Sequence, residues 1–73
     1  MKILVEVIFK RGGRKRFIII KHKGFLGGEK WIVAEPGFWG PKKIGEAPSY
    51  NGALSVIAMK YGDIKDVRVL KQG

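Results

Sequence analysis

The sequence predicts a small α+β domain with the element order β-β-β-loop-α-β, in which one helix packs on one face of an antiparallel sheet. Three observations predict this class. Apolar and polar residues alternate near both ends of the chain, a Gly-Gly pair separates the first two apolar runs, and a helical spacing of apolar residues begins near residue 50. The 73 residues contain no repeat and suit a single domain.

A β-hairpin is expected over residues 2–23. Apolar residues occupy every second position from Ile3 to Phe9, and the run "RFIIIKH" from residue 16 is aromatic and β-branched, so both segments are typical of strands. Between them, Gly12 and Gly13 suit the two central positions of a type I′ turn, which both need positive φ. The basic stretch "KRGGRKR" therefore marks the tip of a hairpin.

A two-residue turn at this glycine pair would also set the register of the hairpin. Arg11 would face Arg14, and Lys10 would face Lys15. Like charges in such positions destabilise a strand pair unless a bound polyanion neutralises them. One face of the hairpin would be core and would carry Ile3, Val5, Val7, Phe9, Ile18 and Ile20. The other face would mix charged side chains with Leu4, Ile8, Phe17 and Ile19.

The following segments complete the sheet. After the glycine-marked bend "KGFLGG", the run "EKWIVAE" at residues 29–35 predicts a third strand with Trp31 in the core. Residues 36–48 hold all three prolines and three glycines, so we expect a long loop without regular structure. A final strand is expected over residues 64–71, where Val67 and Val69 alternate with charged residues.

A helix is expected over residues 50–61, between the loop and the final strand. Ser49 or Asn51 would cap its first turn, and Gly62 would end it. The residues that recur at helical spacing on its apolar face are Tyr50, Leu54, Ile57, Ala58 and Tyr61. We therefore interpret both tyrosines as packing residues.

The composition excludes several kinds of site. The chain has no cysteine and one histidine, His22, so we expect no metal centre, no disulfide and no cofactor. The acids are scattered and no phosphate-loop motif is present, so we expect no enzymatic activity. The start "MKILVEVIFK" is no signal peptide and no apolar run spans a bilayer, which predicts a cytoplasmic protein without membrane contact. Few amides with abundant lysine are typical of thermophilic organisms.

The net charge of +9 is concentrated in one segment. Residues 10–23 hold seven of the fifteen lysines and arginines and no acid. Such a segment predicts a surface for a polyanion, because each lysine or arginine that contacts a phosphate releases condensed counterions. The candidate nucleic-acid-binding residues are Lys10, Arg11, Arg14, Lys15, Arg16, Lys21 and Lys23. The alternative is a solvated turn whose charge serves solubility.

A second candidate site is the stretch "EPGFWGPKK" in the long loop. Phe38 and Trp39 would offer rings on which unpaired bases stack, and Lys42 and Lys43 would contact phosphates. The alternative is that both rings fold back as a lid over the open face of the sheet, because so small a domain needs apolar cover. In that case the two lysines alone would contact a partner.

Together these sites predict a non-enzymatic protein that binds structured RNA, as ribosomal and ribosome-associated proteins do. RNA is preferred to DNA because the helix carries one cation, Lys60, and so lacks the charge of a helix that reads the major groove. Two alternatives stay open. One is a chromatin or viral protein that binds double-stranded DNA without sequence preference. The other is a protein–protein interaction module or homodimer, formed through an exposed strand edge or through residues 38–39.

The segment "GALSVIAMKYG" followed by "IKDVRVLK" resembles the end of the archaeal large-subunit ribosomal protein LX, where a helix closes on a glycine and a basic strand follows. This resemblance covers about a third of the chain. The histidine and arginine cluster that follows the glycine in that family is replaced here by Asp63 and Asp66. No residue role is therefore transferred from that family.

Overall fold

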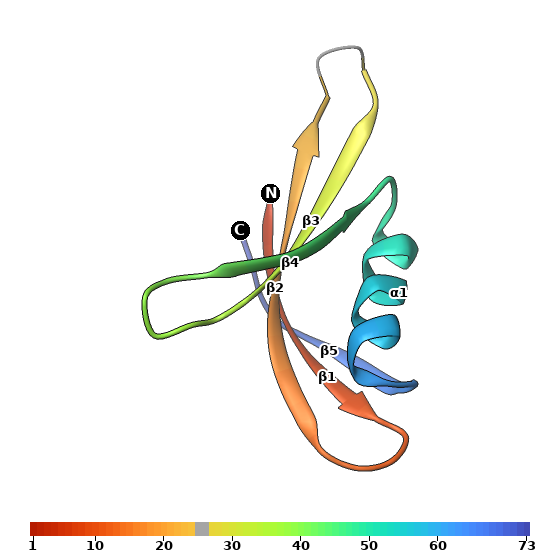
Figure 1. The fold of residues 1–73 in the computed structure, drawn as a ribbon. Helices are drawn as coiled ribbons and strands as arrows, with labels where there is room; N and C mark the ends of the chain where they lie inside the picture. The colour runs from red at the N-terminus through yellow and green to blue at the C-terminus, as the bar shows by residue number, and fades with distance from the viewer. Residues whose placement is uncertain (25–26) are drawn as a thin grey trace.

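The protein is described by a computed structural model, which covers residues 1–24 and 27–73. Within these residues one antiparallel sheet has the strand order β4-β3-β2-β1-β5, and a single helix covers one of its faces (Figure 1). The elements are β1 (Lys2–Phe9), β2 (Arg14–Lys23), β3 (Glu29–Glu35), β4 (Lys42–Ala47), α1 (Tyr50–Tyr61) and β5 (Ile64–Gln72). The predicted α+β class is confirmed. Residues 25–26 of the predicted bend lie outside the described residues.

The expectation of an irregular loop over residues 36–48 is wrong, because residues 42–47 form strand β4 against the edge of β3. All three prolines stand outside this strand, where they need not donate a ladder hydrogen bond. A register shift opposite Val33 and Ala34 lets β4 carry an extra residue. The connection that remains between β3 and β4 is short, and it holds Phe38 and Trp39.

The predicted register of the β1–β2 hairpin is also wrong. Glu6 pairs with Arg16 and Ile8 pairs with Arg14, which shifts the strands by three residues from the two-residue-turn arrangement. The turn is longer because the N–H of Gly12 donates to the carbonyl of Phe9 at 3.0 Å, and the N–H of Phe9 donates to the carbonyl of Gly13 at 3.1 Å. Both glycines still have positive φ, at 103° and 88°.

This odd shift exchanges the two faces of β2. Phe17 and Ile19 are fully buried in the core, whereas Ile18 and Ile20, the predicted core residues, are half-buried on the other side of the sheet. The predicted contacts between like charges are absent as well. Lys15 faces Val7, and both Arg14 and Arg16 also face residues of β1. The destabilisation by opposed like charges, which a bound polyanion would have relieved, therefore does not arise in the folded hairpin.

The core lies between the sheet and α1. Ser49 caps the helix, since its Oγ accepts from the N–H of Gly52 at 3.0 Å, and Gly62 ends it with φ of 113°. Gly45 lets β4 approach the helix closely, because a Cβ there would lie 2.6 Å from a methyl carbon of Val56. The buried apolar side chains of this core are Ile3, Val5, Val7, Phe9, Phe17, Ile19, Trp31, Val33, Ala53 and Ile57.

The second face of the sheet, which we call the open face, has no described helix over it (Figure 1). Its side chains alternate with those of the core along all five strands. They are Lys2, Leu4, Glu6, Ile8, Arg14, Arg16, Ile18, Ile20, His22, Lys30, Ile32, Ala34, Lys43, Glu46, Asp66, Arg68 and Lys71. No helix in the described part of the chain is long and apolar enough to cross a membrane.

Candidate nucleic-acid interface

The basic residues of β2 have acidic partners on both neighbouring strands, β1 and β3. Glu6 lies between two arginines, with its carboxylate oxygens 3.7 Å from Arg14 Nη1 and 3.7 Å from Arg16 Nε. On the next strand, Glu29 Oε1 lies 3.2 Å from Lys21 Nζ. The segment that holds no acid in the sequence is thus partly neutralised by the sheet. These three cations remain on the surface, but each already has a carboxylate nearby.

Arg11 has a structural role at the tip of this hairpin. Its Nη2 donates to the backbone carbonyl of Tyr61 at 2.9 Å, at the last residue of α1. A cation at this end of a helix interacts favourably with the helix dipole and satisfies a carbonyl that lacks an intrahelical partner. Arg11 therefore links the hairpin tip to the helix, and only part of its hydrogen-bonding capacity is left for a ligand.

Lys15 belongs to a polar cluster on the helix face of the sheet, together with Glu35 and Tyr61. Lys15 Nζ lies 3.2 Å from Glu35 Oε2 and 4.5 Å from the centre of the Tyr61 ring. The Tyr61 hydroxyl donates to the Glu35 carboxylate. That hydrogen bond, with the Lys15 ammonium beside it, holds the pKa of Glu35 below its ordinary value, and contacts with Tyr61 and Glu35 raise the pKa of Lys15.

We expect the substitution Glu35→Gln to weaken the acid dependence of stability. Because the pKa of Glu35 is lower in the folded chain, its contribution is present above the ordinary value of 4.5 and is lost as pH falls through the folded pKa. Thermal unfolding followed by circular dichroism should show a smaller fall in Tm from about pH 6 to pH 3 in the variant than in the parent. Some fall should remain, because Lys21 and Lys43 lower the pKa of Glu29 and Glu46 in the same direction. Parallel curves for the two proteins would contradict this account.

The remaining predicted cations differ in their surroundings. Lys43 Nζ lies 2.8 Å from Glu46 Oε2, and Lys30 shares the same carboxylate at 3.1 Å. Within the described residues, Lys10, Lys23 and Lys42 are exposed and have no carboxylate oxygen within 4.0 Å. These three lysines are therefore the predicted contacts whose charge is most available to a polyanion.

Phe38 and Trp39, which we call the aromatic tip, are the two most exposed large apolar residues of the described chain. Their relative exposures are 92% and 94%, so the interpretation of these rings as a lid over the sheet is wrong. The N–H of Gly40 donates to the carbonyl of Gly37 at 3.1 Å, which closes a turn with the two aromatic residues at its centre. The β3–β4 connection extends beyond the sheet on the side away from α1 (Figure 1).

The physical reason for this exposure is that the core needs no lid. The helix already covers the apolar side of the sheet, with Trp31 packed edge-on against Tyr50 at a ring-centre distance of 5.7 Å. The rings of Phe38 and Trp39 contact each other edge-on instead, with centres 5.0 Å apart. Two large rings are thus exposed on a turn closed by a backbone hydrogen bond, and Lys42 follows them in the sequence.

Sequence reasoning missed the cations of the open face. Lys2, Lys30, Arg68 and Lys71 lie on the same side of the sheet as Arg14 and Arg16 of β2, but they come from three other strands, β1, β3 and β5. Only the pairing of strands that are distant in sequence brings them together, so no local pattern could have indicated this surface. His22 is exposed at the end of β2, and no group of three metal-ligating side chains occurs in the described residues.

Comparison of the chain with protein-family models, with curated proteins and with solved structures finds no match. The resemblance of residues 52–71 to ribosomal protein LX therefore receives no support from these comparisons.

Proposed function

We propose that this protein is a non-enzymatic, cytoplasmic nucleic-acid-binding module whose ligand is structured RNA with unpaired bases. The observation that carries the proposal is the aromatic tip, where Phe38 and Trp39 are almost fully exposed and Lys42 follows without a nearby carboxylate. Unpaired bases stack on such rings, and each stacked base contributes about 1–3 kcal/mol. A ribosomal or ribosome-associated role is part of this proposal.

The distribution of charge supports a polyanionic ligand. The chain has fifteen lysines and arginines against six acids. Each described acid except Asp63 is within 4.0 Å of a cation, yet many cations remain without such a partner in the described residues. These cations are Lys2, Lys10, Arg11, Lys23, Lys42, Lys60, Lys65 and Lys71. A surplus of this size steers anionic partners towards the protein and makes binding dependent on salt.

RNA with unpaired bases suits the surface better than duplex DNA does. The helix α1 has Lys60 as its one cation and packs on the sheet, so it offers no charged face to a major groove. A duplex would contact the cations through its phosphates and leave the aromatic tip without a role. Single-stranded loops present splayed bases that aromatic side chains bind by stacking. Binding to duplex DNA without sequence preference remains the second choice among nucleic acids.

The proposal is tested with the variant Lys10→Gln/Lys23→Gln/Lys42→Gln, measured by fluorescence anisotropy with a labelled RNA stem-loop over a range of salt. Each phosphate contact on a single strand contributes about 0.7 to the slope of log affinity against log salt, so losing three should reduce the slope by about 2. The matched control is Lys10→Arg/Lys23→Arg/Lys42→Arg, which keeps the charge and should keep the slope. Failure of the parent protein to bind RNA or DNA would refute the proposal.

A second candidate function, self-association, is favoured by one observation. Strand β5 is a nine-residue edge strand, and Val69 and Leu70 on it are largely exposed. Such an edge offers unpaired backbone groups to another chain. Lys65, Arg68 and Lys71 on the same strand oppose the approach of an identical edge. Analytical ultracentrifugation should therefore find a monomer, and a dimer that persists at high salt would favour self-association instead.

A further inference from the structure

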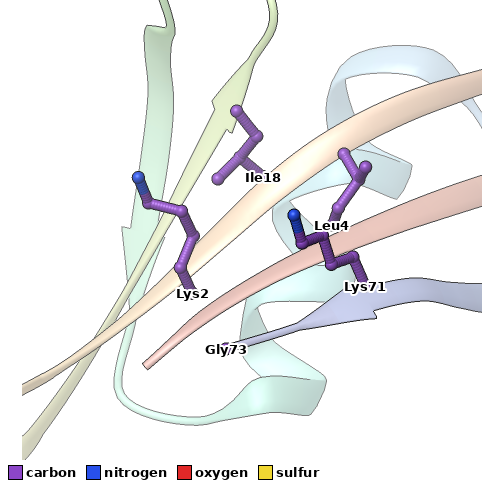
Figure 2. Close-up of a pocket in the computed structure, with 5 residues that line it drawn as sticks. All are labelled: Lys2, Leu4, Ile18, Lys71 and Gly73. Carbon is purple, nitrogen blue, oxygen red and sulfur yellow. The ribbon is translucent and has the colours of Figure 1, made fainter.

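The open face contains an apolar hollow at the end of the sheet where β1, β2 and β5 meet. It has a volume of about 360 Å³ and is lined by Lys2, Leu4, Ile18, Lys71 and Gly73 (Figure 2). Leu4 and Ile18 provide an apolar surface, and Figure 2 shows Lys2 at the left of the view and Lys71 next to Leu4, with which it pairs. A volume of this size falls in the range of sites that bind small organic groups.

Strand pairing explains why the hollow exists. Leu4 pairs with Ile18 on β2 and with Lys71 on β5, so these three side chains form one row across the sheet. In the neighbouring row, Lys2 and Gly73 exchange two backbone hydrogen bonds, of 2.8 and 3.0 Å. Because glycine has no side chain, the space beside Lys2 is left unfilled. The hollow therefore follows from this strand register together with the glycine at position 73.

Apolar side chains extend this surface towards β3. The row of Leu4 and Ile18 continues to Ala34, and the row of Lys2 continues to Ile20 and Ile32. Around this apolar strip the open face carries seven cations and three acids, which are Lys2, Arg14, Arg16, Lys30, Lys43, Arg68 and Lys71 against Glu6, Glu46 and Asp66. Neither Lys2 nor Lys71 has a described carboxylate oxygen within 4.0 Å.

The apolar strip and the surplus of cations around it together favour one kind of occupant over others. A second copy of the chain would bring an identical positive face against the first, so the two faces would repel each other. A single anionic head group could use two cations, but the cations of the open face are distributed over all five strands. A chain of phosphates carrying partly apolar bases and sugars matches both the distributed charge and the apolar strip.

We propose that the apolar hollow binds one nucleotide of a single-stranded RNA segment that crosses the open face. The base and ribose pack on Leu4 and Ile18, and the adjoining phosphates contact Lys2 and Lys71. This inference rests on the proposed function and adds a second contact region to the aromatic tip. It assigns a binding role to four residues that the sequence pattern did not mark as ligands.

The test compares the variant Lys2→Gln/Lys71→Gln with Lys60→Gln/Lys65→Gln, a control that has the same net charge but loses one lysine from α1 and another from the far end of β5. Both are titrated with a fluorescent single-stranded RNA of about eight nucleotides, a site size within the range of single-strand binders. The first variant should reduce the salt slope by about 1.4 more than the control does. In the parent protein, the methyl NMR signals of Leu4 and Ile18 should shift on RNA addition while those of Val69 stay unchanged.

The outcomes separate the inference from the proposed function. Equal slopes for the two variants, or unchanged Leu4 and Ile18 signals in a protein that binds RNA, would overturn the hollow as a nucleotide site and leave the proposed function standing. If the parent protein does not bind RNA at all, both the nucleotide site and the proposed function are overturned. Sedimentation with vesicles of phosphatidylglycerol and phosphatidylcholine tests whether the hollow binds lipid instead. Vesicle binding that depends on Lys2 and Lys71 and resists competition by RNA would assign the surface to lipid and overturn the inference.

Discussion

The variant Phe38→Ala/Trp39→Ala is expected to bind an RNA stem-loop about 10- to 100-fold more weakly than the parent protein does, in line with the loss of one or two stacked bases. Its thermal stability should change little, because both rings are more than nine-tenths exposed and contact mainly each other. The measurement is fluorescence anisotropy with labelled RNA at one fixed salt concentration, accompanied by thermal unfolding of the free proteins.

Two controls make this result specific to aromatic stacking. The variant Phe38→Tyr/Trp39→Phe keeps a ring at each position and should retain most of the affinity. The variant Met59→Ala removes another large and exposed apolar side chain, on the surface of α1, and should bind like the parent protein. Equal affinity of the parent and the alanine double variant would show that the aromatic tip does not contact RNA.

The second large effect concerns stability and compares Ile19→Ala with Ile20→Ala. Ile19 is fully buried against the core, so its truncation should lower the free energy of unfolding by about 2–5 kcal/mol. Ile20 is half-buried on the open face, and the same truncation there should lower it by about 1 kcal/mol. A domain of this length has a total stability of about 4–11 kcal/mol, so Ile19→Ala should remove a large fraction of it. Urea denaturation measures both values.

This pair of identical substitutions distinguishes the two possible registers of the β1–β2 hairpin. The observed register buries Ile19, whereas a two-residue turn at Gly12 and Gly13 would bury Ile20 with Ile18. A larger loss for Ile20→Ala than for Ile19→Ala would contradict the observed register. Because the two positions are adjacent and carry the same residue type, differences in side-chain size or strand propensity cannot produce the effect.

The sequence predicted the elements better than it predicted their pairing. Helix α1 spans the expected residues, and alternation located β1, β3 and β5 closely, because period and capping are local properties. The hairpin register is not local. Phe9 pairs with Ile64, and the N–H of Lys10 donates to the carbonyl of Asp63 at 2.9 Å, so β5 holds the end of β1 and the turn starts at Phe9. A turn rule applied to two glycines could not include a strand that lies more than fifty residues away in the sequence.

The same limit applies to the candidate site. Residues 10–23 contain seven cations and no acid in the sequence. The sheet, however, places Glu6, Glu29 and Glu35 beside four of these cations. Strand β4 was missed because the prolines and glycines around it indicated a loop, although a free edge of β3 was available for pairing. The exposure of Phe38 and Trp39 followed from this hairpin. Their exposure depended on tertiary structure, and base stacking on their rings stays a prediction.

The most direct test of the account is a titration of the intrinsic tryptophan fluorescence with a stem-loop RNA. The chain has two tryptophans, of which Trp31 is buried and Trp39 is exposed at the aromatic tip. Stacking of a base on Trp39 should quench a large part of the emission and saturate, and Trp39→Phe should abolish the quenching while Trp31 continues to emit. Emission that stays constant as RNA binds, or quenching that persists in Trp39→Phe, would contradict the central claim that the aromatic tip binds unpaired bases.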